Sequence, residues 1–387
     1  MRRLNILFIM PQMGMGGSER LVHNLALRLD RDRFNPSVAW FTGAKALKDF
    51  EDLHVPLHHV PKTKRVDLST MRALARIIRS DRIDVVNAQH FMPAVYAYYG
   101  CRLASRKALI FTAHSRWEVE DMSLKWRVAG GYLLRRISAS VGVAPDVSRV
   151  IQGVFKTRAS QTVTIENGVD IDAFVEERDV RALRNTLGLA NGDMVIGIVA
   201  NLKKVKNHSL LLKAFVKVVA VYENVKLLVV GQGFPGELDN TEEDLRSFVD
   251  GHRLTERVLF LGYRTDIPAL LQLMDVFCLT SLKEGLPIGL IEAMVSGRAV
   301  VSTNVEGSRD VIEHNRDGLL VECNDVESLA NTLIELLTDS GLRHRLGTAA
   351  RRKAVDKYSL SRCVKEYEAL FSSAVHDVSM LHGRAIG

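Results

Sequence analysis

Short apolar runs alternate with amphipathic stretches along most of the chain. This alternation is typical of parallel sheets whose strands are joined by right-handed helical crossovers. Helices are expected over Ser18–Leu29, with Ser18 as the cap, and over Asn207–Val221 and Val326–Leu337. The expected strands are Ile6–Met10, Ser37–Phe41, Ile83–Val86, Leu109–Thr112, Ser140–Val143 and Val163–Ile165 in the first half, and Val195–Val199, Lys226–Val230, Val258–Leu261, Val276–Leu279, Ala299–Ser302 and Gly318–Val321 in the second.

Two open α/β sheets in succession account for a chain of 387 residues better than one core does. Asn-Gly and Leu-Gly pairs punctuate the segment from Asn167 to Gly192, which is the best candidate for a linker. The expected domains are residues 1–175 and 176–358, and a helix over residues 359–375 could pack back on the first domain, followed by a loose tail. Since open α/β sheets bind ligands at the carboxyl ends of their strands, two sheets facing each other would place the chemistry in a cleft.

The charge is divided unevenly along the chain. Residues 1–160 contain 26 lysines and arginines against 13 acidic residues, whereas the whole chain has a net charge of +7. The first half is therefore expected to meet an anionic partner, such as a membrane surface or a lipid phosphate. Nucleic acid is disfavoured, because zinc-finger spacing and interleaved aromatic and basic residues are both missing. The four cysteines have neither zinc-ligand nor redox spacing, which suggests a reducing cytoplasm.

A glycine-rich turn, from Gly14 through Gly16 and Gly17 to Glu19, follows the first expected strand and precedes a helix. Glycines let backbone amides approach a phosphate there, and the start of a helix favours negative charge. A dinucleotide fingerprint would need glycine at the position of Glu19, which argues against a nicotinamide or flavin oxidoreductase. A tight turn without a ligand is the alternative.

A second candidate site follows the expected strand Val276–Leu279. The amides of Gly285 and Leu286 would lie at the start of a helix, where a diphosphate gains from both the amides and the helix dipole. Glu292 would lie about one turn into that helix, within reach of ribose hydroxyls, and Glu284 would face a sugar from the loop. The alternatives are a general acid/base pair and two solvated surface carboxylates.

A third candidate site, with Lys206, follows the expected strand Val195–Val199. A cationic side chain at the end of a strand can neutralise the charge that grows on a departing diphosphate. We choose Lys206 for this role and expect the neighbouring Lys203 and Lys204 to be solvated. An exposed loop lysine without a role is the alternative.

In this order and spacing, the three sites resemble those of the retaining glycosyltransferases of family four, also called group 1, which have the GT-B architecture of two Rossmann-like domains facing a cleft. The resemblance extends over nearly the whole chain, and its most specific part runs from Glu284 through Glu292 to Gly297. It also includes the Gly-Gly-x-Glu loop at Gly16 to Glu19, Asn167-Gly-Val-Asp170 followed by Phe174, the Lys206 loop, Gly231-x-Gly233 and Leu261-Gly262-Tyr263.

The resemblance implies a role for each matching residue. Glu284 would contact donor-sugar hydroxyls, Glu292 the ribose, and Lys206 with Gly16 or Gly17 the diphosphate. The backbone near Tyr263, Arg264 and Ile267 would frame the base, and Gly285 and Leu286 would supply amides to the donor. His114 matches the active-site histidine of the family, which contacts the sugar or the acceptor. The expected catalytic residues are therefore His114, Lys206 and Glu284.

One position departs from the family pattern. The family has Gly-Arg-Leu before its lysine, whereas this chain has Ala200-Asn201-Leu202. The departure removes a fork-shaped phosphate donor, so either Asn201 makes a weaker contact beside Lys206, or Lys203 or Lys204 substitutes. The resemblance also implies front-face transfer without a cofactor, and no metal is expected.

The expected enzyme is thus a hexosyltransferase that uses a nucleotide-diphosphate sugar and a glycan or lipid-linked acceptor in bacterial cell-envelope or exopolysaccharide synthesis. A GT-B nucleotide-sugar epimerase and a non-catalytic sugar-nucleotide-binding protein remain alternatives. The expected location is cytoplasmic, with possible peripheral attachment to the membrane. A surface for such attachment could include Trp117, Trp126, Arg127, Val128, Leu133, Leu134, Arg135 and Arg136, and the alternative there is a core helix with a solvated basic edge.

Overall fold

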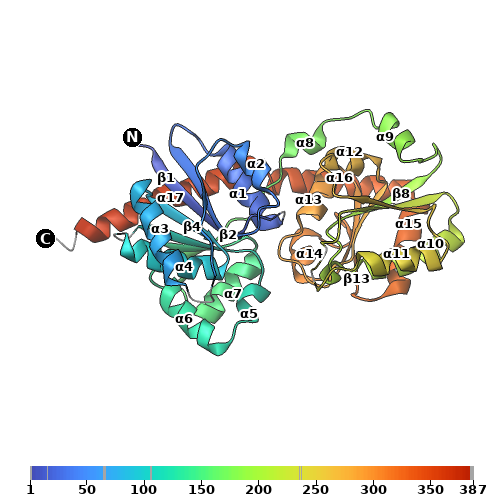
Figure 1. The fold of residues 1–387 in the computed structure, drawn as a ribbon. Helices are drawn as coiled ribbons and strands as arrows, with labels where there is room; N and C mark the ends of the chain where they lie inside the picture. The colour runs from blue at the N-terminus through green and yellow to red at the C-terminus, as the bar shows by residue number, and fades with distance from the viewer. Residues whose placement is uncertain are drawn as a thin grey trace. The chain divides into compact units, whose positions relative to one another are not determined.

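A computed structural model describes residues 2–14, 16–63, 67–104, 107–234, 236 and 238–383, without the side chains of residues 377–383. The chain forms two compact units. The first consists of Met1–Gly168 with Leu360–Gly387, and the second of Val169–Ser359 (Figure 1). Residues 169–175 therefore belong to the second unit, and our expected boundary after residue 175 was seven residues too late.

The first unit contains a parallel sheet of seven strands among its described residues, in the order β3-β2-β1-β4-β5-β6-β7. Its strands are β1 (Leu4–Gln12), β2 (Phe34–Thr42), β3 (Leu57–His59), β4 (Val85–Gln89), β5 (Ala108–Ala113), β6 (Ala139–Gly142) and β7 (Thr162–Thr164). Its helices are α1 (Gly17–Arg28), α2 (Leu47–Glu51), α3 (Leu68–Ser80), α4 (Phe91–Leu103), α5 (Trp117–Glu120), α6 (Leu124–Leu134), α7 (Pro145–Phe155), the 3-10 turn η1 (Ala159–Gln161) and α17 (Leu360–Gly383).

The second unit contains a parallel sheet of six strands among its described residues, in the order β10-β9-β8-β11-β12-β13. Its strands are β8 (Met194–Val199), β9 (Val225–Val230), β10 (Val258–Gly262), β11 (Val276–Leu279), β12 (Ala299–Thr303) and β13 (Leu319–Val321). Its helices are α8 (Ile171–Val175), α9 (Arg181–Thr186), the 3-10 turn η2 (Lys204–Lys206), α10 (His208–Val221), α11 (Glu242–Gly251), α12 (Ile267–Leu273), α13 (Ile288–Val295), α14 (Glu306–Val311), α15 (Val326–Thr338) and α16 (Ser340–Lys357).

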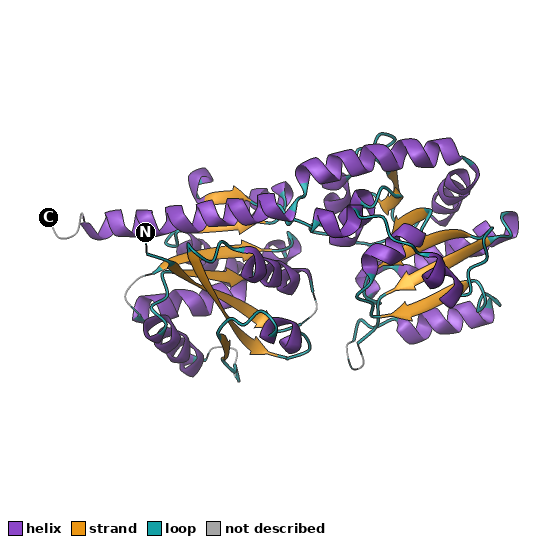
Figure 2. Cartoon of the chain, turned by 90° about the horizontal axis from the view of Figure 1, so that it is seen from above, coloured by secondary structure: helices purple, strands orange, loops and turns teal. Residues whose placement is uncertain are grey.

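The strands are continuous apolar runs because helices cover both faces of each sheet (Figure 2). In β1, Leu7 and Ile9 enter one core cluster of the first unit, while Ile6, Phe8 and Met10 enter the other. This alternation follows from the two-residue period of a strand. A strand with one polar face could not be buried on both sides in this way.

The last helix, α17, belongs to the first unit. Its Phe371 makes edge-to-face contacts with Phe8 of β1 and Phe34 of β2, with ring centroids 6.0 and 6.3 Å apart. Tyr367 and Cys363 are buried in the same cluster. The helix continues to Gly383, so most of the tail that we expected to be loose is helical, and only residues 384–387 lie outside the described part.

Two smaller expectations were wrong. Gly16, not Ser18, occupies the N-cap of α1, and the Ser18 hydroxyl donates to Glu19 instead. Strand β3 was missed, because its three residues, Leu57–His59, are too short and too polar to stand out from a loop. In the described part of the chain, no helix combines the length and hydropathy that a membrane span requires.

Candidate active site

The order of strands in the second sheet reverses between β8 and β11. From β8 the chain continues to β9 and β10 on one side, and β11, β12 and β13 lie on the other. Ligands of open α/β sheets bind beyond the carboxyl ends of the strands at such a point. Lys206 follows β8 and Glu284 follows β11, so the topology brings these two predicted residues to the same place.

Lys206 and Glu284 form an ion pair, with Nζ and Oε1 2.7 Å apart. The Glu284 side chain is 8% exposed and that of Lys206 is 23% exposed. The Ser281 hydroxyl donates to the same Oε1 atom at 2.5 Å. Glu284 is the one hydrogen-bond partner of the Lys206 ammonium among the described residues, so two of its three donors remain for an anionic ligand.

Hydrogen bonds join the loop after β8 to the loop after β11. The Leu282 amide donates to the Val205 carbonyl at 2.8 Å, and the Thr280 hydroxyl donates to the Lys206 carbonyl at 3.1 Å. The Thr303 hydroxyl, at the end of β12, donates to the Ser281 carbonyl at 2.5 Å. The folded chain therefore positions the ion pair before any ligand arrives, which reduces the entropy that binding must overcome.

Gly307 packs against the predicted phosphate loop, and the sequence reasoning missed it. A Cβ atom at this position of α14 would lie 2.3 Å from the Gly285 carbonyl oxygen and 2.8 Å from that of Glu284. Only glycine allows α14 to approach the predicted phosphate loop so closely. The signal in the sequence was weak, because a single glycine five residues after an expected strand end fits many turns.

The helix α13 begins at Ile288, with Pro287 at its N-cap and no side-chain cap within the described residues. Gly285 and Leu286 directly precede that cap, so the expected position of their amides at the start of the helix is correct. Glu292 lies just over one turn into α13, as expected, and is 1% exposed. An acidic side chain this deeply buried needs polar partners, which excludes the solvated surface alternative.

The residues expected to frame a base follow β10, at the far edge of the sheet from β11. Arg264 forms a two-point ion pair with Asp266, at 2.7 and 2.5 Å, and Ile267 begins α12. The hydrogen bond to Arg264 lowers the pKa of Asp266, so the pair is charged at neutral pH. The Tyr263 side chain is 52% exposed. Three strand spacings, roughly 14 Å, separate β10 from β11, which gives an extended nucleotide room to lie along the sheet edge.

Asn201 occupies the position of the arginine of the family. Its side-chain Oδ1 atom is buried and has no hydrogen-bond partner in the described part of the chain. The Lys203 ammonium lies 3.6 Å from the Asp239 carboxylate, whereas Lys204 is exposed. This arrangement favours the alternative in which Asn201 contacts the ligand beside Lys206, because Lys203 is already engaged by an acid.

In the first unit, the glycine-rich turn lies over a buried acid. Glu19 is buried, and Cβ atoms at Gly14 and Gly16 would lie 2.9 and 2.7 Å from its carboxylate oxygens. No neighbour lies within 4 Å of a Cβ atom at Gly17 in the described structure, so Gly17 faces open space. A Cβ atom at Gly16 would displace the Glu19 carboxylate, whereas Gly17 leaves room for a ligand. Met15, within this turn, lies outside the described residues.

His114 follows β5 and is held by a chain of hydrogen bonds. Its Nε2 atom lies 2.8 Å from Oε1 of Gln89, whose amide donates to Asn87 at 2.5 Å; Asn87 in turn donates to the Thr112 hydroxyl at 3.0 Å. Because each amide in this chain donates onward, the Gln89 oxygen must accept, and His114 carries its proton on Nε2. The Nδ1 atom is then an acceptor for a hydroxyl group.

Glu118 and His90 support His114, and the sequence reasoning identified neither. Glu118 accepts hydrogen bonds from the His90 ring at 2.9 Å, from the Phe91 amide at 2.7 Å and from the His114 amide at 3.3 Å. His90 has a φ of 70°, a conformation that costs a residue other than glycine roughly 1–3 kcal/mol. The Glu118 contacts hold this strained turn, and the two imidazole rings lie 4.7 Å apart.

The two histidines have opposite pKa shifts. Burial lowers the pKa of His90, but the charge of Glu118 and its hydrogen bond outweigh burial, with a further contribution from Glu19, so the pKa is raised. Burial and the neighbouring His90 hold the pKa of His114 well below its usual range. A neutral His114 beside a more basic His90 is suited to accepting a hydroxyl hydrogen bond.

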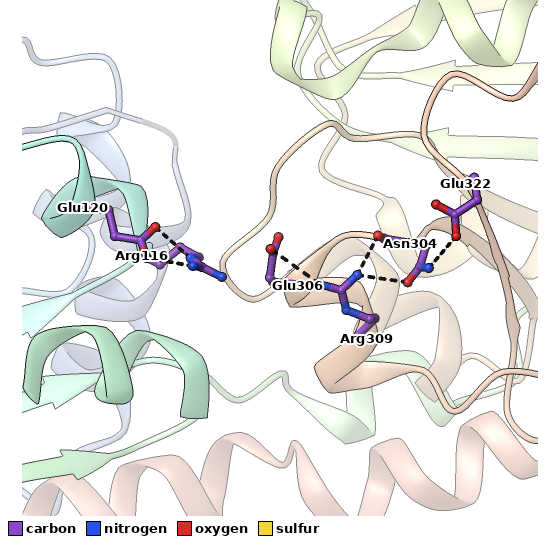
Figure 3. Close-up of polar contacts among 6 residues, drawn as sticks. All are labelled: Arg116, Glu120, Asn304, Glu306, Arg309 and Glu322. Atoms are coloured by element: carbon purple, nitrogen blue, oxygen red, sulfur yellow. Dashed lines mark hydrogen bonds and ion pairs between the residues drawn. The ribbon is translucent and has the colours of Figure 1, made fainter. Parts of the chain in front are cut away.

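Figure 3 shows further polar groups that follow strands of the two sheets. In the second unit, after β12 and β13, Arg309 contacts Glu306 at 3.5 Å and the Asn304 carbonyl at 3.0 Å, and Asn304 donates to Glu322 at 2.7 Å. In the first unit, Arg116 makes a two-point ion pair with Glu120 after β5. No group of three or more His, Cys, Asp or Glu residues in the described chain could hold a metal ion.

Two family models divide the chain between them. The model described as Glycosyltransferase Family 4 matches residues 15–173, and the model described as Glycosyl transferases group 1 matches residues 179–353. The chain belongs to the group 1 glycosyltransferases of family four. The enzyme is thus a glycosyl transferase that uses a nucleotide sugar, with the GT-B fold of two parallel sheets.

Two curated relatives match this glycosyltransferase over most of their length. One is N-acetyl-alpha-D-glucosaminyl L-malate synthase of Bacillus anthracis, which is 25% identical over 85% of this chain and 84% of its own. Another is the UDP-Gal:alpha-D-GlcNAc-diphosphoundecaprenol alpha-1,3-galactosyltransferase of Escherichia coli, which is 24% identical over 85% of this chain and 87% of its own.

Solved structures share the fold of this glycosyltransferase. Anabaena HepE in complex with UDP-glucose superimposes with a TM-score of 0.85 at 24% identity, over 96% of this chain and 100% of its own. The lipopolysaccharide-synthesis glycosyltransferase WaaG gives a TM-score of 0.73 at 17% identity, over 94% and 99% of the two chains. At these identities the likeness shows the fold and not the substrate.

Proposed function

We propose that this glycosyltransferase is a retaining hexosyltransferase. In this proposal, it moves a sugar from a nucleotide-diphosphate donor to a hydroxyl of a glycan or a lipid-linked intermediate in cell-envelope or exopolysaccharide synthesis. The observation that carries the proposal is the Lys206–Glu284 ion pair, which lies where the strand order of the second sheet reverses, beside the start of α13. A cation and uncapped helix amides at one point form a site suited to a diphosphate.

The second unit would hold the donor as an extended chain along its sheet edge. Lys206, Asn201 and the amides of Gly285 and Leu286 would bind the diphosphate. Glu292 would bind the ribose, the backbone from Tyr263 through Arg264 to Ile267 would frame the base, and Glu284 would bind sugar hydroxyls while Lys206 holds its carboxylate in place. UDP-linked hexoses are the first donors to test, because HepE binds UDP-glucose.

In the proposed reaction, the bond between the anomeric carbon and the diphosphate oxygen breaks, and the acceptor oxygen attacks from the same face. The acceptor proton passes to the departing diphosphate, so no protein base is required. Lys206 and the helix amides stabilise the negative charge that grows on the diphosphate. The first unit would hold the acceptor, with Gly16 and Gly17 near phosphate groups and Nδ1 of His114 accepting a hydroxyl hydrogen bond.

We also propose that the first unit attaches to an anionic membrane through α6. Leu124, Val128 and Tyr132 lie at four-residue intervals on this helix and are 75%, 67% and 54% exposed. Lys125, Arg135 and Arg136 are exposed beside them. This stripe differs from the surface expected from the sequence, since Leu133 and Leu134 are buried and Trp126 packs against the core. Apolar and basic side chains together suit an anionic interface.

A panel of nucleotide sugars tests the donor assignment. Thermal stabilisation identifies ligands that bind the folded enzyme, and release of nucleoside diphosphate identifies donors. With an accepted donor and acceptor, proton NMR of the product distinguishes retention from inversion, and a free epimerised sugar nucleotide would instead indicate an epimerase. Stabilisation without any transfer or hydrolysis across the panel would contradict the enzyme proposal.

Vesicle sedimentation tests the membrane proposal. The protein should sediment with phosphatidylglycerol vesicles more than with neutral ones, and moderate salt should weaken the binding. Leu124→Ser with Val128→Ser should abolish binding and leave turnover of a soluble acceptor unchanged. Equal sedimentation of the variant and the wild type would remove α6 from the proposal.

A further inference from the structure

The second unit contains a cavity of about 660 Å³ that lies apart from the candidate active site. It is bounded by α8, by the turn between α13 and β12, and by α16. Cavities of this size accommodate small metabolites. Its lining includes Val175, Ser296, Arg298, His344, Arg351 and Arg352.

Arg298 is fixed at the floor of this cavity. Its Nε atom donates to the Ser296 carbonyl at 3.0 Å, and its Nη1 atom donates to the Met274 carbonyl at 3.0 Å. An arginine has five donors, so most of the guanidinium remains available to a ligand. Its position at the end of α13 is favourable for a cation, because the C-terminus of a helix carries partial negative charge.

A close contact between backbones brings a second arginine to the same place. A Cβ atom at Gly347 of α16 would lie 2.3 Å from the Gly297 carbonyl oxygen, so only glycine lets this helix approach the turn. Arg351 lies one helical turn after Gly347 on the same face of α16. Its Cδ atom would be 3.7 Å from a Cβ atom at Gly297. Arg351 therefore lies against the turn that contains Arg298.

The charges of the cavity are incompletely neutralised. Neither Arg351 nor Arg352 has an ion-pair or hydrogen-bond partner among the described residues, whereas Arg343 and Arg345 of the same helix donate to backbone carbonyls. Burial lowers the pKa of Arg298, Asp275 opposes this, and Arg351 lowers it further. Asp356 is the one acidic residue in the lining. Cations held together in this way attract an anion.

We propose that this cavity is a binding site for a small phosphorylated ligand, distinct from the donor site. The two arginines of α16 and the fixed Arg298 would grip the phosphate, and Thr348 and Ser296 offer hydroxyl groups to the rest of the molecule. The site lies at the last turn of α13, whereas the donor site lies at its first turn, roughly 12 Å away along eight residues. The Ser296 hydroxyl already donates to the Glu292 carbonyl at 3.0 Å, so a ligand there contacts the helix that carries the predicted ribose-binding residue.

Calorimetric titration of the full chain with pyrophosphate and with glucose 6-phosphate, at physiological ionic strength, tests the proposal. The Lys206→Ala variant weakens phosphate binding at the donor site and should retain the second site. Adding Arg351→Gln and Arg352→Gln should weaken that remaining binding by about tenfold or more, since each removes a charge-assisted contact. Arg345→Gln, which removes a charge from the same helix outside the cavity, should not.

The proposal would be overturned if the Lys206→Ala protein bound pyrophosphate and glucose 6-phosphate with the same affinities with and without the two α16 substitutions. Circular dichroism of each variant verifies the fold, and the substituted arginines are exposed, so loss of folding is not expected. Binding of glucose 6-phosphate would indicate a soluble metabolite. A lipid would instead be the source of the phosphate group if two results are found together. The protein would sediment with phosphatidic-acid vesicles only when Arg351 and Arg352 are present, and it would not bind glucose 6-phosphate.

Discussion

Replacing Lys206 by alanine should affect stability and turnover separately. The substitution leaves the Glu284 carboxylate buried, with the Ser281 hydroxyl as its one side-chain donor among the described residues. Removing one partner of a buried pair costs about 3 kcal/mol, the lower end of the usual range, since Lys206 is 23% exposed. For a unit of this size the midpoint of thermal unfolding should fall by roughly 6–12 °C. Turnover should fall by on the order of 10²-fold or more, because charge on the leaving diphosphate is no longer stabilised.

The double variant Lys206→Ala with Glu284→Gln separates the two effects. A neutral amide has little need of a cation, so most of the lost stability should return, whereas turnover should remain low. Calorimetry measures the first quantity, and steady-state release of nucleoside diphosphate measures the second. Recovery of turnover together with stability would refute the reasoning, since it would mean that Lys206 acts only by holding the loop.

Three further perturbations test other contacts. Gly307→Ala should displace the carbonyls of residues 284 and 285 and raise the donor KM several-fold in steady-state kinetics. Gly251→Ala is the control and should leave the donor KM unchanged, because the space around its Cβ is open. Burial lowers the pKa of His208 to about 4, so between pH 7 and pH 5 the unfolded chain gains a proton that the folded one does not. The free energy of unfolding should therefore fall by about 2 kcal/mol over this range. Denaturant titration of His208→Gln should show that this contribution has disappeared. Gln89→Leu removes the acceptor of His114 and should lower kcat about tenfold with little change in donor KM, whereas unchanged kcat would exclude the hydrogen-bond chain from catalysis.

The order and the limits of most strands could be predicted because each is an apolar run between polar turns. Strand β3 could not, since Leu57–His59 pairs with β2 through its backbone and carries two histidines. The unit boundary was misplaced for a related reason. The Val169 amide donates to the Tyr358 carbonyl, and Val169 forms a β-bridge with Ser359. Contacts between residues so far apart in the chain cannot be predicted from a local sequence pattern.

The candidate site was predicted in its parts more than in its connections. Residue type and spacing indicated Lys206 and Glu284, because strand ends and helix starts constrain what can bind there, whereas His114 was indicated only by the resemblance to the family. Their ion pair depends on β8 and β11 being neighbours, which sequence order alone does not determine. Glu118 was overlooked because its three hydrogen bonds go to groups up to 28 residues away, so its surroundings in the sequence look like an ordinary polar helix.

The helix α17 completes the core of the first unit, although it is synthesised after the whole of the second unit. A nascent chain that has emerged only as far as Ser359 has both sheets but leaves Phe8 and Phe34 without their partner Phe371. The second unit, contiguous from Val169 to Ser359, can fold on the ribosome first, while the first waits for its final helix. Premature termination near residue 360 would consequently damage the first unit, although residues 1–168 of that unit would already have been synthesised.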